Sequence, residues 1–118
     1  MIINLPWPPA QLRPNSARRS HWRSNATLAK RYKDDCLIAL LEQRVKKSAG
    51  APVGVDITFH APSRRKYDRD GSLSAIKAGL DILAAHIGMD DDDFEPITLR
   101  RGDVIKGGLV VIIITEKA

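Results

Sequence analysis

Carboxylates gather in two short segments of a chain that is otherwise basic. Asp68 and Asp70 flank an arginine, and four consecutive aspartates follow at positions 90–93. Side chains two residues apart on an extended segment point to the same side, so Asp68 and Asp70 can share one cation. Mg²⁺ prefers oxygen ligands and is usually held by one or two carboxylates, with phosphate oxygens and water completing its shell. The two segments therefore suggest a phosphodiester bound against a divalent metal ion.

Each acidic segment also has a simpler explanation. Aspartate-rich loops before a helix are common, and Asp70 could serve only as a helix N-cap. A run of four acids after a helix is by default a solvated turn. For metal binding, only one or two of residues 90–93 need to be ligands, and Phe94 gives a packing anchor that could fix their geometry. The residues alone leave both interpretations open.

Lys77 lies two helical turns beyond Asp70 and could reach a phosphate from there. It also lies four residues before Asp81, so an ordinary ion pair along a helix is an equal alternative. Basic residues at 64–66 precede the first acidic pair, where they would neutralise phosphates next to the metal.

Charge is distributed unevenly along the chain. Residues 1–33 carry seven Lys or Arg and no acid, whereas nine of the fourteen acids lie between Asp68 and Asp103. This asymmetry predicts an arm that faces nucleic acid and a separate acidic site, although solvated surface charge alone would also give the net charge of +5. Arginines of the arm suit phosphate, and Trp22 can stack on an unpaired base. His21 could be a general base, but we favour a hydrogen bond to phosphate or protein. The residues expected to contact DNA are Asn15, Arg18, Arg19, His21, Trp22, Arg23, Arg64, Arg65, Lys66 and Arg69.

Hydrophobic periodicity predicts the elements that would position these residues. We expect strands at 2–7, 53–61, 97–101 and 109–115, helices at 25–47 and 72–86, and an irregular arm at 8–25. Asp70 or Ser72 could cap the second helix, and Gly88 could end it. The order β-α-β-α-β-β predicts an α+β fold, a small mixed sheet with two packed helices, in a single domain spanning 1–118.

Several apolar positions are expected to face the core. In the first helix they are Leu28, Tyr32, Leu37, Leu40, Leu41 and Val45; in the second, Leu73, Ile76, Leu80, Leu83 and Ile87; in the second strand, Val53, Val55, Ile57 and Phe59. Cys36 is the only cysteine, which excludes an internal disulfide and a zinc site built on several thiolates, and predicts a small core residue. No signal-peptide pattern and no apolar run long enough for a bilayer is present, so we expect no membrane partner and a cytoplasmic protein.

Five motifs together resemble one known family, the RusA-type Holliday junction resolvases, in particular the versions found in phage and prophage genomes. The motifs are Leu5-Pro-Trp-Pro-Pro9, Arg13-Pro-Asn-Ser16 with His21-Trp-Arg23, Arg65-Lys-Tyr-Asp-Arg-Asp70 running to Lys77-Ala-Gly-Leu-Asp81, Gly88-Met-Asp-Asp91, and Lys106-Gly-Gly108 before an apolar strand. The resemblance spans nearly the whole chain.

The resemblance implies a homodimeric, Mg²⁺-dependent endonuclease, with Mn²⁺ as a substitute, that cuts four-way DNA junctions by paired nicks in recombination and repair. The family's catalytic aspartates match Asp68, Asp70 and Asp91, and its catalytic-region lysine matches Lys77. The three aspartates and the neighbouring Asp90 would hold the metal. Gly71 departs from the family pattern, which usually has Asn after the second aspartate. Two alternatives follow: a nuclease for other branched DNA such as flaps and forks, or a basic DNA-binding protein with impaired catalysis.

The length of the second helix predicts that the active site is shared between two subunits. Asp70 precedes this helix and Asp91 follows it, and a helix over 72–86 is about 22 Å long. The segment 87–91 can reach back only about 15–18 Å when fully extended. In a two-fold dimer, Asp91 of one chain could instead approach Asp70 of the other. The alternative is a helix that ends near Ala84 and lets both acidic segments meet within one chain.

Overall fold

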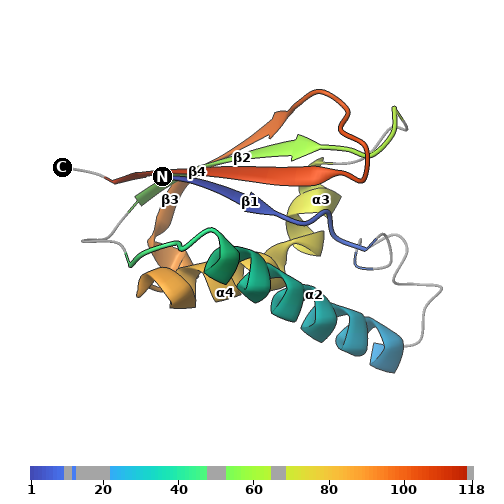
Figure 1. Ribbon diagram of the computed structural model, residues 1–118, viewed down its shortest axis with the longest axis horizontal. Coiled ribbons are helices and arrows are strands. Elements are labelled where there is room, and N and C mark those ends of the chain that lie inside the picture. The colour runs from blue at the N-terminus through green and yellow to red at the C-terminus, as the bar shows by residue number, and fades with distance from the viewer. Residues whose placement is uncertain (10–11, 13–21, 48–52, 65–68, 117–118) are drawn as a thin grey trace.

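The structure is a computed structural model that describes residues 1–9, 12, 22–47, 53–64 and 69–116 (Figure 1). Its elements are β1 (Ile2–Leu5), α2 (Trp22–Glu42), β2 (Val53–His60), α3 (Arg69–Ala75), α4 (Lys77–Ile87), the short 3-10 helix η2 (Asp91–Asp93), β3 (Phe94–Arg101) and β4 (Leu109–Glu116). The predicted α+β class and the order of strands and helices are confirmed. No helix of the described residues is long and apolar enough to cross a membrane.

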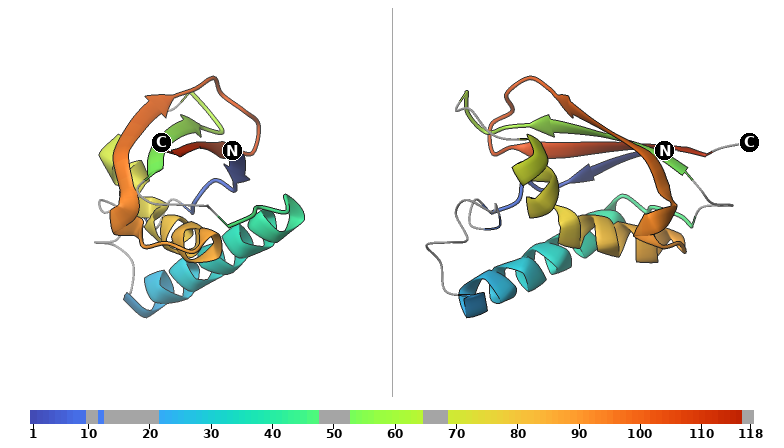
Figure 2. Two further views of the ribbon diagram at one scale, coloured as in Figure 1. Left: turned by 90° about the vertical axis from the view of Figure 1, so that its left-hand side faces the viewer. Right: turned by 180° about the vertical axis from the view of Figure 1, so that it is seen from behind.

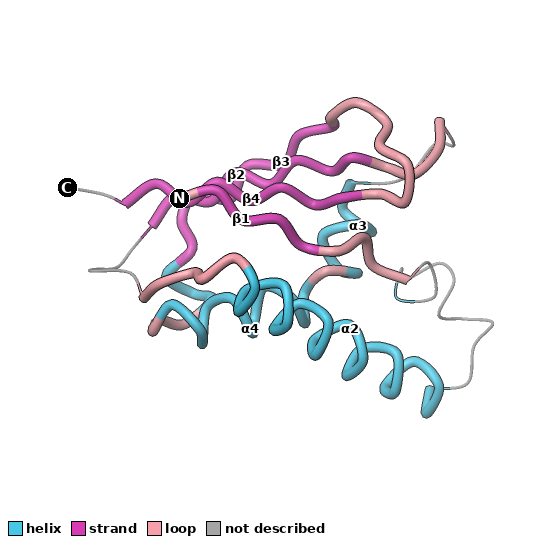
Figure 3. Tube along the Cα trace, viewed as in Figure 1, coloured by secondary structure: helices cyan, strands magenta, loops and turns pink. Residues whose placement is uncertain are grey.

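Four strands form one mixed sheet in the order β1-β4-β2-β3. β4 runs antiparallel to both β1 and β2, whereas β3 runs parallel to β2. Figures 1 and 2 show α2 and α4 covering one face of this sheet. We call the end at which β1, β2 and β3 finish and β4 begins the loop end; Figure 3 shows that long loops gather there. The parallel pairing matters for function, because the connection from β2 to β3 must travel back along the whole sheet.

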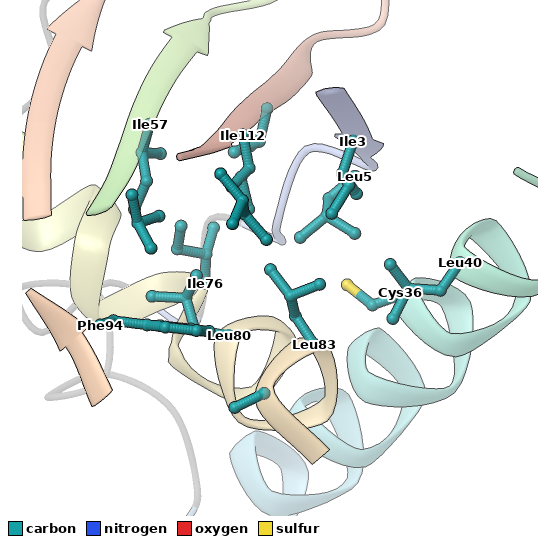
Figure 4. Close-up of a cluster of buried hydrophobic side chains, with 14 of the residues drawn as sticks. Ile3, Leu5, Cys36, Leu40, Ile57, Ile76, Leu80, Leu83, Phe94 and Ile112 are labelled. Atoms are coloured by element: carbon teal, nitrogen blue, oxygen red, sulfur yellow. The ribbon is translucent and has the colours of Figure 1, made fainter. Parts of the chain in front are cut away.

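The core lies between the sheet and the two long helices. Alternation along β2 buries its predicted face, as Val53, Val55, Ile57 and Phe59 are all buried. Figure 4 shows Ile57 and Ile112 of the sheet pointing at Leu80 and Leu83 of α4. Phe94 is buried too, so it anchors the start of β3 as expected. Burying each such side chain contributes about 1.5–3 kcal/mol of transfer free energy.

The two long helices approach each other closely at one glycine. A Cβ atom on Gly79 would lie 2.9 Å from Cys36 Sγ and 3.2 Å from the Tyr32 ring. The Tyr32 hydroxyl donates a hydrogen bond to the carbonyl oxygen of Pro6 at 2.8 Å, which ties α2 to the chain leaving β1. Cys36 is fully buried, as predicted, and burial raises the pKa of its thiol to about 11. Gly79 therefore sets how α4, and with it Lys77, sits against α2.

The helix boundaries differ from those predicted. α2 begins at Trp22, since residues 22–24 contain no Pro or Gly that would stop helix propagation, and it ends at Glu42. Leu41 is 59 % exposed, so its assignment to the core face was wrong, whereas the predicted core residues Tyr32, Cys36 and Leu40 are buried.

The predicted second helix is broken into α3 and α4 at Ile76. α3 already begins at Arg69, so Asp70 and Ser72 lie within it and the prediction that either caps the helix is wrong. The break lets the buried Ile76 side chain enter the core at the corner where α3 turns away from α4 (Figure 4). At the other end the prediction is confirmed: Gly88 adopts the left-handed conformation, with φ of 86°, and its N–H donates to the last carbonyls of α4.

Candidate functional site

The first acidic segment reaches the loop end of the molecule. Asp68 lies outside the described residues, together with Arg65 and Lys66. Asp70 and Arg69 form the first turn of α3, and the positions of their side chains also lie outside the described part. α3 follows the end of β2 and lies toward the loop end of the sheet (Figure 1). Arg64, in the loop that leaves β2, is exposed, which suits its predicted contact with phosphate.

The second acidic segment folds into a single 3-10 turn. The Asp93 N–H donates to the carbonyl oxygen of Asp90 at 3.0 Å, and the Asp90 N–H donates to the Asp93 carboxylate at 3.2 Å. The Asp92 N–H lies 3.5 Å from the Asp90 carboxylate. Asp90 and Asp93 thus serve local turn formation, one of the two interpretations open from sequence. Asp92 is exposed, and the Asp91 side chain lies outside the described part.

A single chain holds the two acidic segments apart. η2 leads directly into Phe94, which pairs with Val53 at the start of β2, at the opposite end of the sheet from the loop end. Between Asp70 and Asp91 lies the whole of α4, whose 11 residues span about 16 Å. α4 continues to Ile87, so the alternative in which the helix ends near Ala84 is wrong.

Lys77 occupies the first position of α4, beside the end of α3, and its side chain is exposed. It forms no ion pair with Asp81 in the described part of the chain, and Asp81 is exposed as well. The alternative prediction for Lys77, an ion pair with Asp81 along the helix, is therefore wrong. An exposed ammonium group next to α3 is free to meet a phosphate, as the prediction requires.

An open groove of about 510 Å³ runs along the outer side of α4 toward the second acidic segment. Its lining residues are Asp81, Ala84, Ala85, Gly88, Met89 and Asp90. Small side chains on this face of α4 let another molecule come close to the helix, and the carboxylates of Asp81 and Asp90 give the groove a negative rim.

Most of the predicted DNA-binding arm, including Asn15, Arg18, Arg19 and His21, lies outside the described residues. Trp22 and Arg23 open α2, so the assignment of these two residues to an irregular arm was wrong. The first turns of α2 extend beyond the sheet at the loop end (Figure 1). The first turn of α2, which includes Arg23, therefore lies on the same side of the molecule as α3.

Two motifs that are distant in sequence meet at the loop end. The Trp7 side chain lies on Gly108, where a Cβ atom would come within 2.6 Å of it, and Gly108 has a φ of 76°. The Trp7 ring also packs edge-on against Phe59, with 6.2 Å between ring centroids. The motifs Leu5-Pro-Trp-Pro-Pro9 and Lys106-Gly-Gly108 lie far apart in the sequence, and their spacing does not predict this contact.

The predicted metal ligands have the right chemistry, but most of them lie outside the described part of the chain. The donor set fits Mg²⁺, since aspartate oxygens are its preferred protein ligands. Yet no cluster of three or more His, Cys, Asp or Glu side chains that could hold a metal occurs among the described residues. Asp68 and the side chains of Asp70 and Asp91 lie outside that search, so the predicted ligand set stays a prediction.

Comparison with known proteins gives relatives over nearly the full length. The chain is 30% identical over 115 residues to the crossover junction endodeoxyribonuclease RusA of Escherichia coli K12, covering 97% of this chain and 92% of the relative. The RusA protein of Enterobacteria phage 82 matches to the same extent. An uncharacterized protein of Xylella fastidiosa is 31% identical over 119 residues, covering 96% of this chain and 74% of that protein. No protein-family model matches the chain.

Proposed function

Because the chain belongs to the RusA family of crossover junction endodeoxyribonucleases, we propose that it is a nuclease that resolves four-way DNA junctions. The observation that carries the proposal is the match to RusA over nearly the whole chain. The resemblance of the motifs implies that Asp68, Asp70 and Asp91 take the places of the family's catalytic aspartates. The exposed Lys77 at the start of α4 and the exposed Arg64 in the loop that leaves β2 support it, since both can approach a phosphate backbone.

The aspartates would hold a divalent cation, Mg²⁺ or Mn²⁺. When bound, such an ion lowers the pKa of a water molecule and stabilises the charge that develops on the phosphate. Asp68, Asp70 and Asp91 would supply oxygen ligands, and Asp90 would orient the turn that carries Asp91 through its hydrogen bonds. Lys77 would add positive charge next to the scissile phosphate.

We further propose that each active site is built from two chains of a homodimer. Mg²⁺ accepts ligand oxygens at about 2.1 Å, so two coordinating carboxylates must lie almost in contact. The length of α4 separates the segments that carry Asp70 and Asp91 by much more than this. A two-fold axis would place Asp91 of one chain against Asp70 of its partner. The groove along α4 that leads to Asp90 offers room for the partner.

One alternative function is a basic DNA-binding protein that has lost catalysis. Gly71 favours it, because an amide side chain that the family usually has near the metal is absent and Gly71 is buried within α3. Another alternative is a nuclease for flaps or forks, with the same chemistry. The cytoplasmic location also remains a prediction.

A panel of labelled substrates separates these functions. Four-way junction, three-way fork, flap and linear duplex of equal length are incubated with the protein and Mg²⁺, and products are resolved on a denaturing gel. A junction resolvase cuts the four-way junction fastest and leaves the linear duplex intact. Equal or faster cutting of forks and flaps would replace the proposed substrate, and binding without cutting of any substrate would support the non-catalytic alternative.

A further inference from the structure

The loop between β3 and β4 exposes two adjacent apolar side chains, Val104 and Ile105, just before its turn at 106–107; we call this pair the apolar tip. Val104 is 48 % exposed and Ile105 is 37 % exposed. Scattered exposed apolar residues are normal in proteins, but two neighbouring β-branched residues on one loop tip form a small apolar projection. Figure 3 shows this loop at the loop end of the sheet, beside the loop that leaves β2.

The loop backbone is held in place at four points. The Gly102 N–H donates to the Phe59 carbonyl oxygen at 2.9 Å, and the His60 ring nitrogen Nδ1 lies 2.8 Å from the Asp103 carbonyl oxygen. The Ile105 N–H donates to the Ala61 carbonyl oxygen at 3.1 Å, and the Gly108 N–H to that of Ile105 at 2.8 Å. A loop tied this closely to β2 keeps its apolar tip exposed in a fixed position instead of folding it onto the core.

Basic residues lie on the segments next to this tip, together with one acid, the exposed Asp103 that precedes Val104. Arg64 follows Ala61 in the loop that leaves β2, Arg101 ends β3, and Lys106 follows Ile105; all three are exposed. Arg100 is also exposed, although it lies 3.8 Å from the Asp56 carboxylate. Phosphates on both sides of a branched DNA substrate would meet these cations while the apolar tip faced the bases.

We propose that Val104 and Ile105 form a wedge that enters branched DNA at its branch point. The proposal rests on the proposed function, because it assigns to this loop the recognition of the same branched substrate. Apolar side chains inserted between base steps replace part of the lost base stacking. The energy needed for unstacking is lowest where the stack is already interrupted, as at a branch point, so the wedge selects branched over linear DNA. Arg64, Arg101 and Lys106 hold the flanking phosphates.

The double variant Val104→Thr/Ile105→Thr tests the wedge. Threonine keeps the branched shape and the loop conformation but replaces the apolar surface with a hydroxyl. Its matched control is Ile2→Thr/Ile113→Thr, which changes two exposed apolar residues paired across β1 and β4, away from this loop. Binding is measured in EDTA with a four-way junction that carries 2-aminopurine, an adenine analogue that brightens on unstacking, next to the branch point.

The parent and the control should brighten the probe on binding, whereas the double variant should not. Its affinity for the junction should fall about tenfold, equivalent to about 1.4 kcal/mol, with affinity for linear duplex unchanged. The single variants Val104→Thr and Ile105→Thr give the same readout if the double variant does not fold. Unchanged brightening and affinity in a folded variant would overturn the wedge. The wedge would also be overturned if the parent is a dimer and the variant a monomer in size-exclusion chromatography. That result would mean that the tip contacts another copy of the chain. Since no cleavage is measured, brightening by a protein that cuts nothing in Mg²⁺ would reject the nuclease and retain the wedge.

Discussion

Mixing two inactive variants tests whether the active site is shared between subunits. Asp70→Asn and Asp91→Asn should each abolish cutting, because each removes a proposed metal ligand. In one chain α4, which is about 16 Å long, lies between the two segments, whereas both ligands must approach one ion to about 2.1 Å. In a mixed dimer with shared sites, one site carries both substitutions and the other carries none.

The size of the restored activity follows from this arrangement. Random assortment of equal amounts makes half of the dimers mixed, and half of the sites in those dimers are intact, so about a quarter of the parental sites return. Because each mixed dimer has a single working site, it should nick one strand of a junction without the paired second nick. The assay is cleavage of an end-labelled four-way junction, analysed for nicked and fully resolved products.

A second mixture gives the mirror-image result. The double variant Asp70→Asn/Asp91→Asn mixed with the parent leaves no intact site in a mixed dimer when sites are shared, but one intact site when each site belongs to a single chain. Differently tagged chains show that mixed dimers form. If they form and the mixture of single variants stays inactive, while the double variant leaves one working site per mixed dimer, each site is built within one chain.

Three further predictions concern other parts of the molecule. Asp70→Asn should bind a junction in EDTA at least as tightly as the parent, because it removes a negative charge next to DNA, yet cut far less in Mg²⁺; loss of both would mark Asp70 as structural. Replacing Arg18, Arg19 and Arg23 with Ala should lower the slope of log affinity against log salt by about 0.9 per lost phosphate contact, and an unchanged slope would remove the arm from the interface. Gly79→Ala should destabilise the fold by about 1–3 kcal/mol in urea unfolding, because its Cβ would lie 2.9 Å from Cys36 Sγ, and Cys36→Ala should reduce that loss; additive effects would contradict the close helix contact.

The strand β2 could be predicted from sequence because burial of one face imposes a period of two. β2 alternates strictly, and all four of its predicted inward residues are buried. The helices were predicted less well, since a helix face is wide and its rotation depends on packing against other elements. Leu41 illustrates this: periodicity placed it on the core face beside Leu40, whereas the packing of α2 leaves it 59 % exposed.

The candidate site was harder to predict because it depends on relations between distant segments. Sequence spacing identified both acidic segments, but only the parallel pairing of β2 and β3 places them at opposite ends of the sheet. Likewise, the helix break at Ile76 is not marked by a proline or glycine at that position. The Ile76 side chain is buried in the core there, which the sequence pattern does not show. The Gln43 side chain gives a further example, as it donates to the Asn4 carbonyl oxygen and accepts from the Asn4 N–H, both at 2.7 Å, and so covers the free edge of β1.

Metal-dependent cleavage of a synthetic four-way junction tests the central claim most directly. Purified protein is incubated with the end-labelled junction in Mg²⁺, in Mn²⁺ and in excess EDTA, and the products are mapped on both strands of each arm. The account predicts paired, symmetric nicks with either metal ion and none in EDTA. A junction that is bound but remains uncut in Mg²⁺ and Mn²⁺, or that is cut equally well in EDTA, would contradict it.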